Sequence, residues 1–415
     1  MSYNADLTRR ALIQSTVALP AAAAAAPASA PPPDQTRLLS PVAADSGSAF
    51  PFIDQLAGAV PYPLSFLDGR FHSIDAWRDE TRPAVLHALG PQPAPVLPNP
   101  EIVDRRDMGA YIREKVVFST TANFRVPAYV LIPKNVRTPA PAIVDLHSHG
   151  GMFIFGKEKI LDLEPSHPAM LEYHKVNYEG RPTATALVRR GYVVITIDAF
   201  PFGERRIIMD DDLKYGYERS KYSLDDVTRL NNRCRTREST LAKSLAYAGH
   251  TWPGITAWDD MRTVDYLITR PEVDPRRIGC LGVSFGGWRS LFLSGLDSRI
   301  AAGCVSGFMS TVRPMIRRHM DTHSFVHFVP TLHRLLDLPD VVSLRCPKPL
   351  LVQQCRRDGL FPLQGMEESA EKIAAIYKKA GAQERFTPRF HDLPHILNVA
   401  MQDEAFAWFD RHLKP

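Results

Sequence analysis

A serine between two glycines is the first feature of this sequence that could carry out chemistry. Residues 282–286 read Gly-Val-Ser-Phe-Gly, with Ser284 at the centre. The apolar residues 277–283 favour a strand that runs into this pattern, and the residues after it favour a helix. A sharp strand-to-helix turn exposes the serine hydroxyl, and its crowding leaves no room for a Cβ at the flanking positions. We therefore predict that Ser284 is a catalytic nucleophile.

A serine hydroxyl is a weak nucleophile, so it needs a general base and an acid that orients the base. His395 follows the last predicted strand, residues 385–391, and is the predicted base. Asp358 follows the strand before that one and is the predicted acid. Two alternatives remain open: His391, inside the strand pattern, and Asp392, three residues before His395. The order serine, aspartate, histidine along the chain matches one of the three common triad orders.

The charged intermediate of an acyl transfer needs two converging N–H donors, which together form the oxyanion hole. The backbone amide of Phe285, directly after the nucleophile, is the first predicted donor. The loop after a predicted strand at residues 142–146 contains the sequence His-Gly-Gly at 149–151. We predict that the second donor is the amide of Gly150 or of Gly151.

Histidines in the same loop also allow a metal-binding interpretation. His147 and His149 would point to one side of an extended chain, and Asp145 is close by in the sequence. No second group of ligands accompanies them in the sequence, so we predict neither a metal nor a cofactor. Phe153 and Trp288 are aromatic residues near the predicted site, and we assign them to substrate binding.

The elements that must position these residues alternate along the chain from residue 111 onward. The first two predicted strands, 111–119 and 125–132, alternate apolar and polar residues, as half-buried antiparallel strands do. Later strands are short and almost continuously apolar, which is typical of a parallel sheet covered on both faces. Helical segments separate them, so we predict a mostly parallel eight-stranded sheet with helices on both faces. The six later strands are 142–146, 192–197, 277–283, 301–305, 349–354 and 385–391.

Two polar stretches, residues 205–253 and 308–347, interrupt this alternation. Long irregular insertions in a compact domain usually cover a functional site, so we predict that both form loops over the active site. Residues 31–110 contain two proline-dense segments and precede the alternating region. We interpret them as an N-terminal extension packed on a catalytic domain at 111–415.

The first 30 residues carry the features of a targeting segment. Arg9 and Arg10 precede an alanine-rich, mildly apolar stretch at 11–26, and Ala-Ser-Ala follows at 28–30. This pattern predicts a twin-arginine signal peptide and a periplasmic or secreted bacterial protein. The apolar stretch is too short and too weakly hydrophobic for a stable membrane anchor.

The composition excludes several other classes of protein. There are 50 Lys and Arg against 45 Asp and Glu, a net charge of +5, so no nucleic-acid-binding surface is indicated. The 5 cysteines are scattered without a Cys-x-x-Cys pair, which argues against a zinc site or a disulfide framework.

From about residue 111 to the C-terminus, these motifs resemble the α/β-hydrolase superfamily. Besides Ser284, Asp358 and His395, the resemblance rests on Asp-Ala-Phe-Pro-Phe-Gly-Glu at 198–204 and on the helix and turn before the nucleophile strand. The chain is most similar to the dienelactone-hydrolase and acetyl-xylan-esterase-like serine esterases. The resemblance implies the α/β-hydrolase fold and a triad, but it does not specify the substrate.

The resemblance therefore implies a serine carboxylic-ester hydrolase that forms an acyl-enzyme with a small or carbohydrate-linked ester. Dienelactone hydrolases proper use a cysteine nucleophile, whereas Ser284 favours ordinary esters. Three alternatives remain: an amide, peptide or C–C bond hydrolase with the same triad, a non-catalytic binding protein of this fold, and a scaffold or interaction protein whose insertions form its binding surface.

Overall fold

The computed structural model describes residues 49–208 and 218–414. The chain divides into two compact units, residues 1–53 and 54–415, and the second contains every predicted site residue. The predicted signal peptide at 1–30 lies outside the described residues. No described helix is both long enough and apolar enough to cross a membrane.

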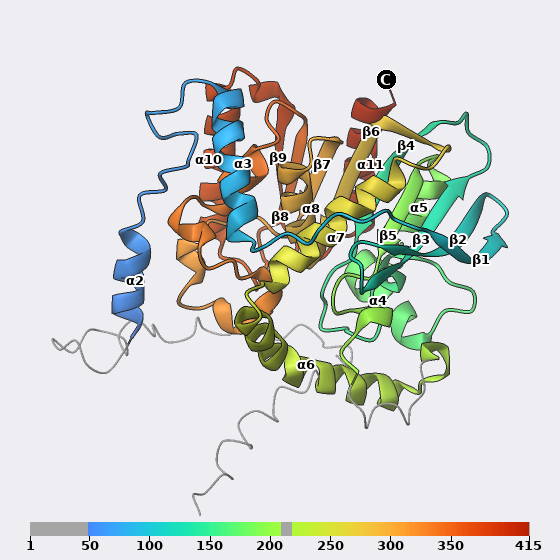
Figure 1. Cartoon of the computed structure of the whole chain (residues 1–415). Helices are drawn as coiled ribbons and strands as arrows, with labels where there is room; N and C mark the ends of the chain where they lie inside the picture. The colour runs from blue at the N-terminus through green and yellow to red at the C-terminus, as the bar shows by residue number, and fades with distance from the viewer. Residues whose placement is uncertain (1–48, 209–217, 415) are drawn as a thin grey trace, which may run out of the picture. The chain divides into compact units, whose positions relative to one another are not determined.

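A nine-stranded sheet in the order β1-β2-β3-β5-β4-β6-β7-β8-β9 is the centre of the second unit (Figure 1). The first strands pair in antiparallel fashion up to the β3–β5 pair, and all pairs from β5–β4 to β8–β9 are parallel. The strands are β1 (Glu101–Asp107), β2 (Tyr111–Ser119), β3 (Arg125–Pro133), β4 (Ala140–Leu146), β5 (Val193–Ile197), β6 (Val273–Val283), β7 (Ile300–Ser306), β8 (Leu350–Cys355) and β9 (Phe386–His391).

The structure has the predicted α/β-hydrolase fold, but its sheet contains nine strands, one more than the predicted eight. The additional strand is β1, which lies at the sheet edge and pairs only with β2. Six of its seven residues are exposed, so neither face carries the apolar alternation that marks a half-buried strand. Part of the predicted extension at 31–110 therefore belongs to the sheet.

Helices cover both faces of the sheet, which is what its almost fully buried central strands require. Helices α5 (Thr183–Arg189) and α11 (Val399–Leu413) pack on one face. Helices α7 (Trp252–Leu267) and α8 (Phe285–Leu296) pack on the other, where α8 also contacts α9 (Leu338–Ser343). The remaining helices are α2 (Phe50–Gly58), α3 (Ile74–Ala88), α4 (Pro168–Tyr178), α6 (Leu224–Tyr247) and α10 (Leu363–Lys379).

The two predicted insertions differ in structure. The insertion at 308–347 consists of short 3₁₀ turns followed by α9, in agreement with an irregular segment. The insertion at 205–253 was predicted to be irregular, but it contains the 24-residue helix α6. Ser223 caps this helix through a capping box with Asp226. Only four residues of α6 are buried, so its sequence lacks the broad apolar stripe that predicts a helix.

Candidate active site

The turn between β6 and α8 holds Ser284 in a strained conformation. Its φ is 60° and its ψ is −125°, a region that residues other than glycine rarely adopt. A Cβ at Gly282 would overlap the carbonyl of Gly286, and a Cβ at Gly286 would overlap the carbonyl of Leu146. Both glycines are therefore required for the turn, as the sequence pattern predicts.

A short hydrogen bond joins the predicted base to the predicted acid. His395 Nδ1 lies 2.6 Å from Asp358 Oδ2, and the Asp358 side chain is 1% exposed. The other carboxylate oxygen accepts from the backbone N–H of Leu360 at 2.8 Å. The carboxylate is thus fixed on both sides. Because Nδ1 donates to it, Nε2 of the neutral ring is left as the proton acceptor.

The imidazole of His395 stands beside the end of the nucleophile strand. A Cβ added to Gly307 would lie 3.4 Å both from His395 Cε1 and from the side chain of Val283, which directly precedes Ser284. His395 Nε2 is buried and has no hydrogen-bond partner among the described residues. A small movement of the Ser284 hydroxyl towards His395 Nε2 would complete the triad. The hydrogen bond between nucleophile and base is often long in an enzyme without substrate.

The structure brings neither alternative residue to this pair. Asp392 forms an ion pair with Arg357 at 3.0 Å, and its side chain is 80% exposed. His391 lies at the end of β9 and contacts Glu404 at 3.2 Å. Both residues are therefore occupied at the surface of the final strand and helix.

The loop after β4 presents two free peptide N–H groups. Lys159 Nζ donates to the carbonyls of Ser148 and His149, each at 2.8 Å. In a planar trans peptide the next N–H points away from the carbonyl, so the amides of His149 and Gly150 face away from Lys159. No acceptor among the described residues reaches either amide. By contrast, the N–H of Gly151 donates to His149 Nδ1 at 3.1 Å.

Of the two predicted loop donors, only Gly150 therefore has a free amide in this structure, and the backbone of His149 joins it. Sequence reasoning missed His149 as a donor because its N–H lies opposite the Ser148 carbonyl, which accepts from Lys159, 11 residues further along the chain.

The side chain of His149 is held by the helical insertion. Its Nε2 lies 3.2 Å from Glu238 of α6, and Ser324 donates to the same carboxylate oxygen at 2.5 Å. Burial lowers the pKa of His149, although Glu238 acts in the opposite direction. Both ring nitrogens thus have protein partners, and α6 and the second insertion meet at this loop.

His147 and Asp145 also have structural partners. His147 Nδ1 donates to the carbonyl of Ser148 at 2.9 Å, and its Nε2 accepts from the backbone N–H of Ala199 at 3.1 Å. Asp145 accepts a 2.6 Å hydrogen bond from Thr183, and burial raises its pKa to about 7. These contacts use the nitrogens that a metal would need.

The two predicted substrate-binding residues are fully buried. Phe153 stacks on Phe202 and makes an edge contact with the ring of His149, both with centroids 5.0 Å apart. Trp288 lies 6.1 Å from the ring of Phe285. Phe153 thus packs on His149 of the loop after β4, and Trp288 packs on Phe285, the residue after the nucleophile.

Comparison with known proteins shows the family of this chain. The sequence pattern of the Abhydrolase family matches residues 65–392. The chain belongs to this family. Among curated proteins, this Abhydrolase-family chain is similar to the hydrolase YtaP of Bacillus subtilis (strain 168), with 25% identity over 81% of this chain and 100% of YtaP. It is also similar to carbohydrate esterase MZ0003 of an unknown prokaryotic organism, with 24% identity over 78% of each chain.

Solved structures share the fold. An acetyl xylan esterase from Bacteroides fragilis NCTC 9343 superimposes with a TM-score of 0.62 and 18% identity, over 85% of this chain and 84% of that one. The glucuronoyl esterase from Solibacter usitatus gives a TM-score of 0.57 and 16% identity, over 85% and 97% of the two chains. At this level of identity the likeness concerns the fold alone.

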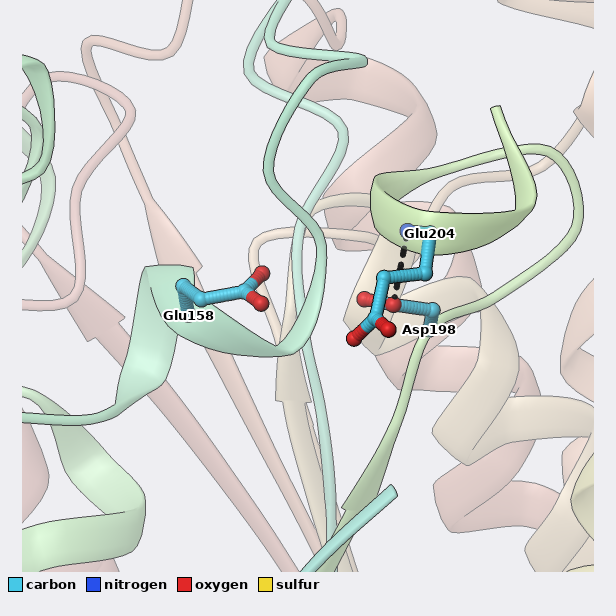
Figure 2. A group of neighbouring side chains, drawn as sticks. All are labelled: Glu158, Asp198 and Glu204. Carbon is cyan, nitrogen blue, oxygen red and sulfur yellow. Dashed lines mark hydrogen bonds between the residues drawn. The ribbon is translucent and has the colours of Figure 1, made fainter. Parts of the chain in front are cut away.

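A second cluster of carboxylates lies in the loops after β4 and β5. Glu158, Asp198 and Glu204 have oxygens within 4.8 Å of one another, close enough to suggest a cation site (Figure 2). The ammonium of Lys157 is already there, 2.6 Å from Asp198 and 2.7 Å from Glu204. A protein cation thus takes the place that a metal would need.

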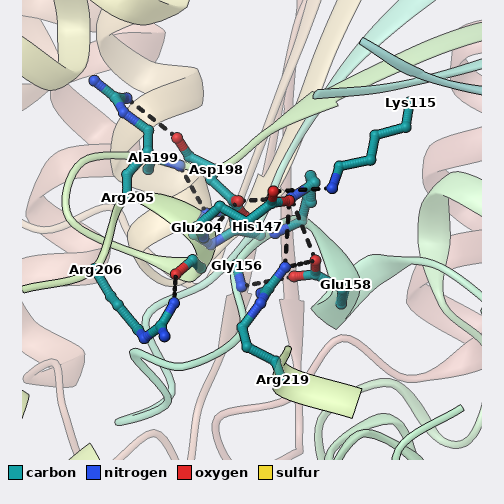
Figure 3. A network of polar contacts seen from close by, with 12 residues as sticks. Lys115, His147, Gly156, Glu158, Asp198, Ala199, Glu204, Arg205, Arg206 and Arg219 are labelled. Carbon is teal, nitrogen blue, oxygen red and sulfur yellow. Dashed lines mark hydrogen bonds and ion pairs between the residues drawn. The ribbon is translucent and has the colours of Figure 1, made fainter. Parts of the chain in front are cut away.

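Two further cations complete this network (Figure 3). Arg219 contacts Glu158 at 2.7 Å, and Lys115 contacts Glu204 at 2.9 Å. Although burial opposes it, the charges of Lys157 and Arg219 bring the pKa of Glu204 down to about 2. Three cations therefore balance three carboxylates, and the network clamps neighbouring loops together.

Proposed function

We propose that this protein is a serine carboxylic-ester hydrolase in which Ser284, His395 and Asp358 form the catalytic triad. The observation that supports this best is the 2.6 Å bond between His395 Nδ1 and Asp358, beside a strained serine. This bond leaves His395 Nε2 as an unpaired base next to the nucleophile strand.

In the proposed reaction, Ser284 attacks the ester carbonyl while His395 takes the hydroxyl proton. The amides of Phe285, His149 and Gly150 are the available donors for the oxyanion. The C–O bond then breaks, and the proton on His395 passes to the leaving alcohol. A water molecule, activated by His395, attacks the acyl-enzyme and releases the acid and Ser284.

The proposed substrate is a small or carbohydrate-linked ester. A curated relative named as a carbohydrate esterase and solved esterases of the same fold support an ester over an amide or a C–C bond. We also propose that Phe153 and Trp288 support the substrate pocket from behind, since they pack on His149 and Phe285.

Hydrolysis of p-nitrophenyl acetate by the wild type and by Ser284→Ala tests this proposal. Loss of the nucleophile should lower kcat by about 10³-fold or more, because the rest of the triad cannot act without it. Ser298→Ala, at an exposed serine, is the matched control and should retain wild-type activity. Equal activity of the wild type and Ser284→Ala would refute the assignment.

We further propose that residues 1–30 direct export by the twin-arginine route. The exported chain would then consist of the extension at 31–110 and the catalytic domain at 111–415, with the extension supplying β1. The paired arginines, the apolar stretch and the small residues at 28–30 support this proposal.

A further inference from the structure

An apolar cavity lies beside the proposed active site and is formed by the second insertion. Its volume is about 310 Å³, and all of its lining residues fall within 308–338. Aromatic rings and flexible thioethers contribute much of the wall, including Phe308, Phe328, Met315 and Met320. A cavity of about 150 Å³ can hold benzene, so this cavity has room for a substituted ring.

Residues that line the cavity contact aromatic rings next to the proposed catalytic residues. The ring of Phe308 lies 5.0 Å from that of Phe361, and Phe361 lies 6.2 Å from His395. On another side, the ring of His327 lies 5.8 Å from Phe285, the residue after the nucleophile. Single aromatic rings therefore separate the cavity from the proposed base and from the start of α8.

Two histidines bring unpaired nitrogens to this apolar wall. His323 and His327 both line the cavity, with ring centroids 5.5 Å apart. His323 Nδ1 donates to the carbonyl of His319 at 2.5 Å, so Nε2 of the neutral ring is an acceptor. This Nε2 and both ring nitrogens of His327 are shielded from solvent and lack a partner within residues 49–208 and 218–414.

Burial lowers the pKa of both histidines, so both rings are neutral near pH 7. Each neutral ring offers one acceptor nitrogen, and His327 also offers an unpaired N–H. Buried polar atoms without partners cost free energy, and a ligand that pairs with them recovers it.

We propose that this cavity binds a hydroxyphenyl ring that forms one half of the ester substrate, with its hydroxyl bonded to His323 and His327. The inference rests on the proposed esterase function, because it names the substrate class of the same site. A flat ring suits the aromatic and methionine wall. A hydroxyl both donates and accepts, which matches the histidine pair. A sugar ring would leave several hydroxyls unpaired against the same wall.

The test compares kcat/KM for esters that differ only in the ring and its hydroxyl. Methyl 4-hydroxyphenylacetate and methyl phenylacetate place the ring on the acid side, 2-(4-hydroxyphenyl)ethyl acetate and 2-phenylethyl acetate place it on the alcohol side, and methyl acetate has no ring. All five esters release an alkyl alcohol, so their leaving groups are of matched reactivity. In at least one series the ring should raise kcat/KM by about tenfold or more. The hydroxyl should add about a further threefold to tenfold.

Three variants separate the contribution of the ring to kcat/KM from the contribution of its hydroxyl. Met320→Trp fills the cavity and should lower the ratio of ring ester to methyl acetate by about tenfold. Leu97→Trp adds the same group at a position that is 76% exposed and should keep the wild-type ratio. His323→Phe keeps an aromatic ring but removes both ring nitrogens, so the hydroxyl preference should fall, with only His327 left to bond the hydroxyl, while the ring preference stays.

The outcomes distinguish failure of this inference from failure of the proposed function. Turnover of methyl acetate with no preference for any ring ester would overturn the cavity assignment and leave the esterase intact. If no ester is turned over and a fluorophosphonate does not react, the proposed function fails. Calorimetry on Ser284→Ala then tests the cavity alone: tighter binding of methyl 4-hydroxyphenylacetate than of methyl phenylacetate supports it, and equal or absent binding contradicts it.

Discussion

Lys159 determines the direction of the two peptide groups that we propose as oxyanion donors. Its ammonium contacts the carbonyls of Ser148 and His149 and lies 4.5 Å from the ring centroid of Phe202. Its side chain is fully buried, and this burial lowers its pKa well below the usual range. In the proposed mechanism Lys159 is a positioning residue, because it would act on the oxyanion only through the backbone.

Lys159→Met should lower kcat by about 10²-fold, close to the loss of one oxyanion donor, because both carbonyls lose the ammonium between them and keep only His147 Nδ1 and the N–H of Met152 as donors. KM should change by less than about twofold, since ground-state contacts remain. The measurement is steady-state hydrolysis of p-nitrophenyl acetate per active site, with active sites counted by fluorophosphonate labelling. A merely structural role would lower the number of active sites and leave kcat per site unchanged, which would contradict the account.

At the scale of elements, the proposed site forms because parallel strands end at one edge of the sheet. The serine follows β6, the aspartate follows β8, the histidine follows β9 and the oxyanion loop follows β4. Strand periodicity and the Gly-x-Ser-x-Gly turn are local signals, so sequence could predict this part. The edge strand β1 and the helix α6 have few buried residues, and sequence patterning could not reveal them.

Details that depend on contacts between segments far apart in the chain also could not be predicted from the sequence. Gly150 and Gly151 look equivalent in the sequence, but a hydrogen bond to His149 Nδ1 engages only Gly151. Glu238 reaches His149 across 89 positions, so nothing local assigns it to the site. The cavity of the second insertion likewise arises from packing, although His323 and His327 were visible as residues of a polar stretch.

The buried ammonium of Lys157 joins the loops after β4 and β5. Lys157→Met should lower the free energy of unfolding by about 3–5 kcal/mol, because it leaves buried carboxylates without their central cation. Lys115→Met is the control: its ammonium contacts Glu204 with a side chain that is 28% exposed, and its loss should cost less than about 1 kcal/mol. Urea unfolding measures both values. Equal losses in the two variants would show that the network is not a buried clamp.

For the whole molecule, the state of the five cysteines is compatible with the proposed export of a folded chain. All five are buried, and no disulfide joins two of them within residues 49–208 and 218–414. A route that exports folded proteins is compatible with such a chain. Residues 1–30 and the folded unit can therefore be tested separately.

Replacing Arg9 and Arg10 together by lysine should retain the protein in the cytoplasm, because the paired arginines are the recognised feature of the signal. Cell fractionation of the wild type and the double variant in a bacterium with this pathway is the measurement. The exported wild type should begin after Ala30. The same distribution of both forms would contradict the proposed route.

The most direct test of the central claim is reaction of the wild type with a fluorophosphonate, followed by mass mapping of the modified peptide. We expect a single adduct, on Ser284, because among the serines that the structure describes it alone combines a strained turn with a neighbouring histidine–aspartate pair. Asp358→Asn should form the same adduct much more slowly, since the imidazole then loses its orienting carboxylate. An adduct on another serine, or none on a folded protein, would contradict the assignment of Ser284 as nucleophile.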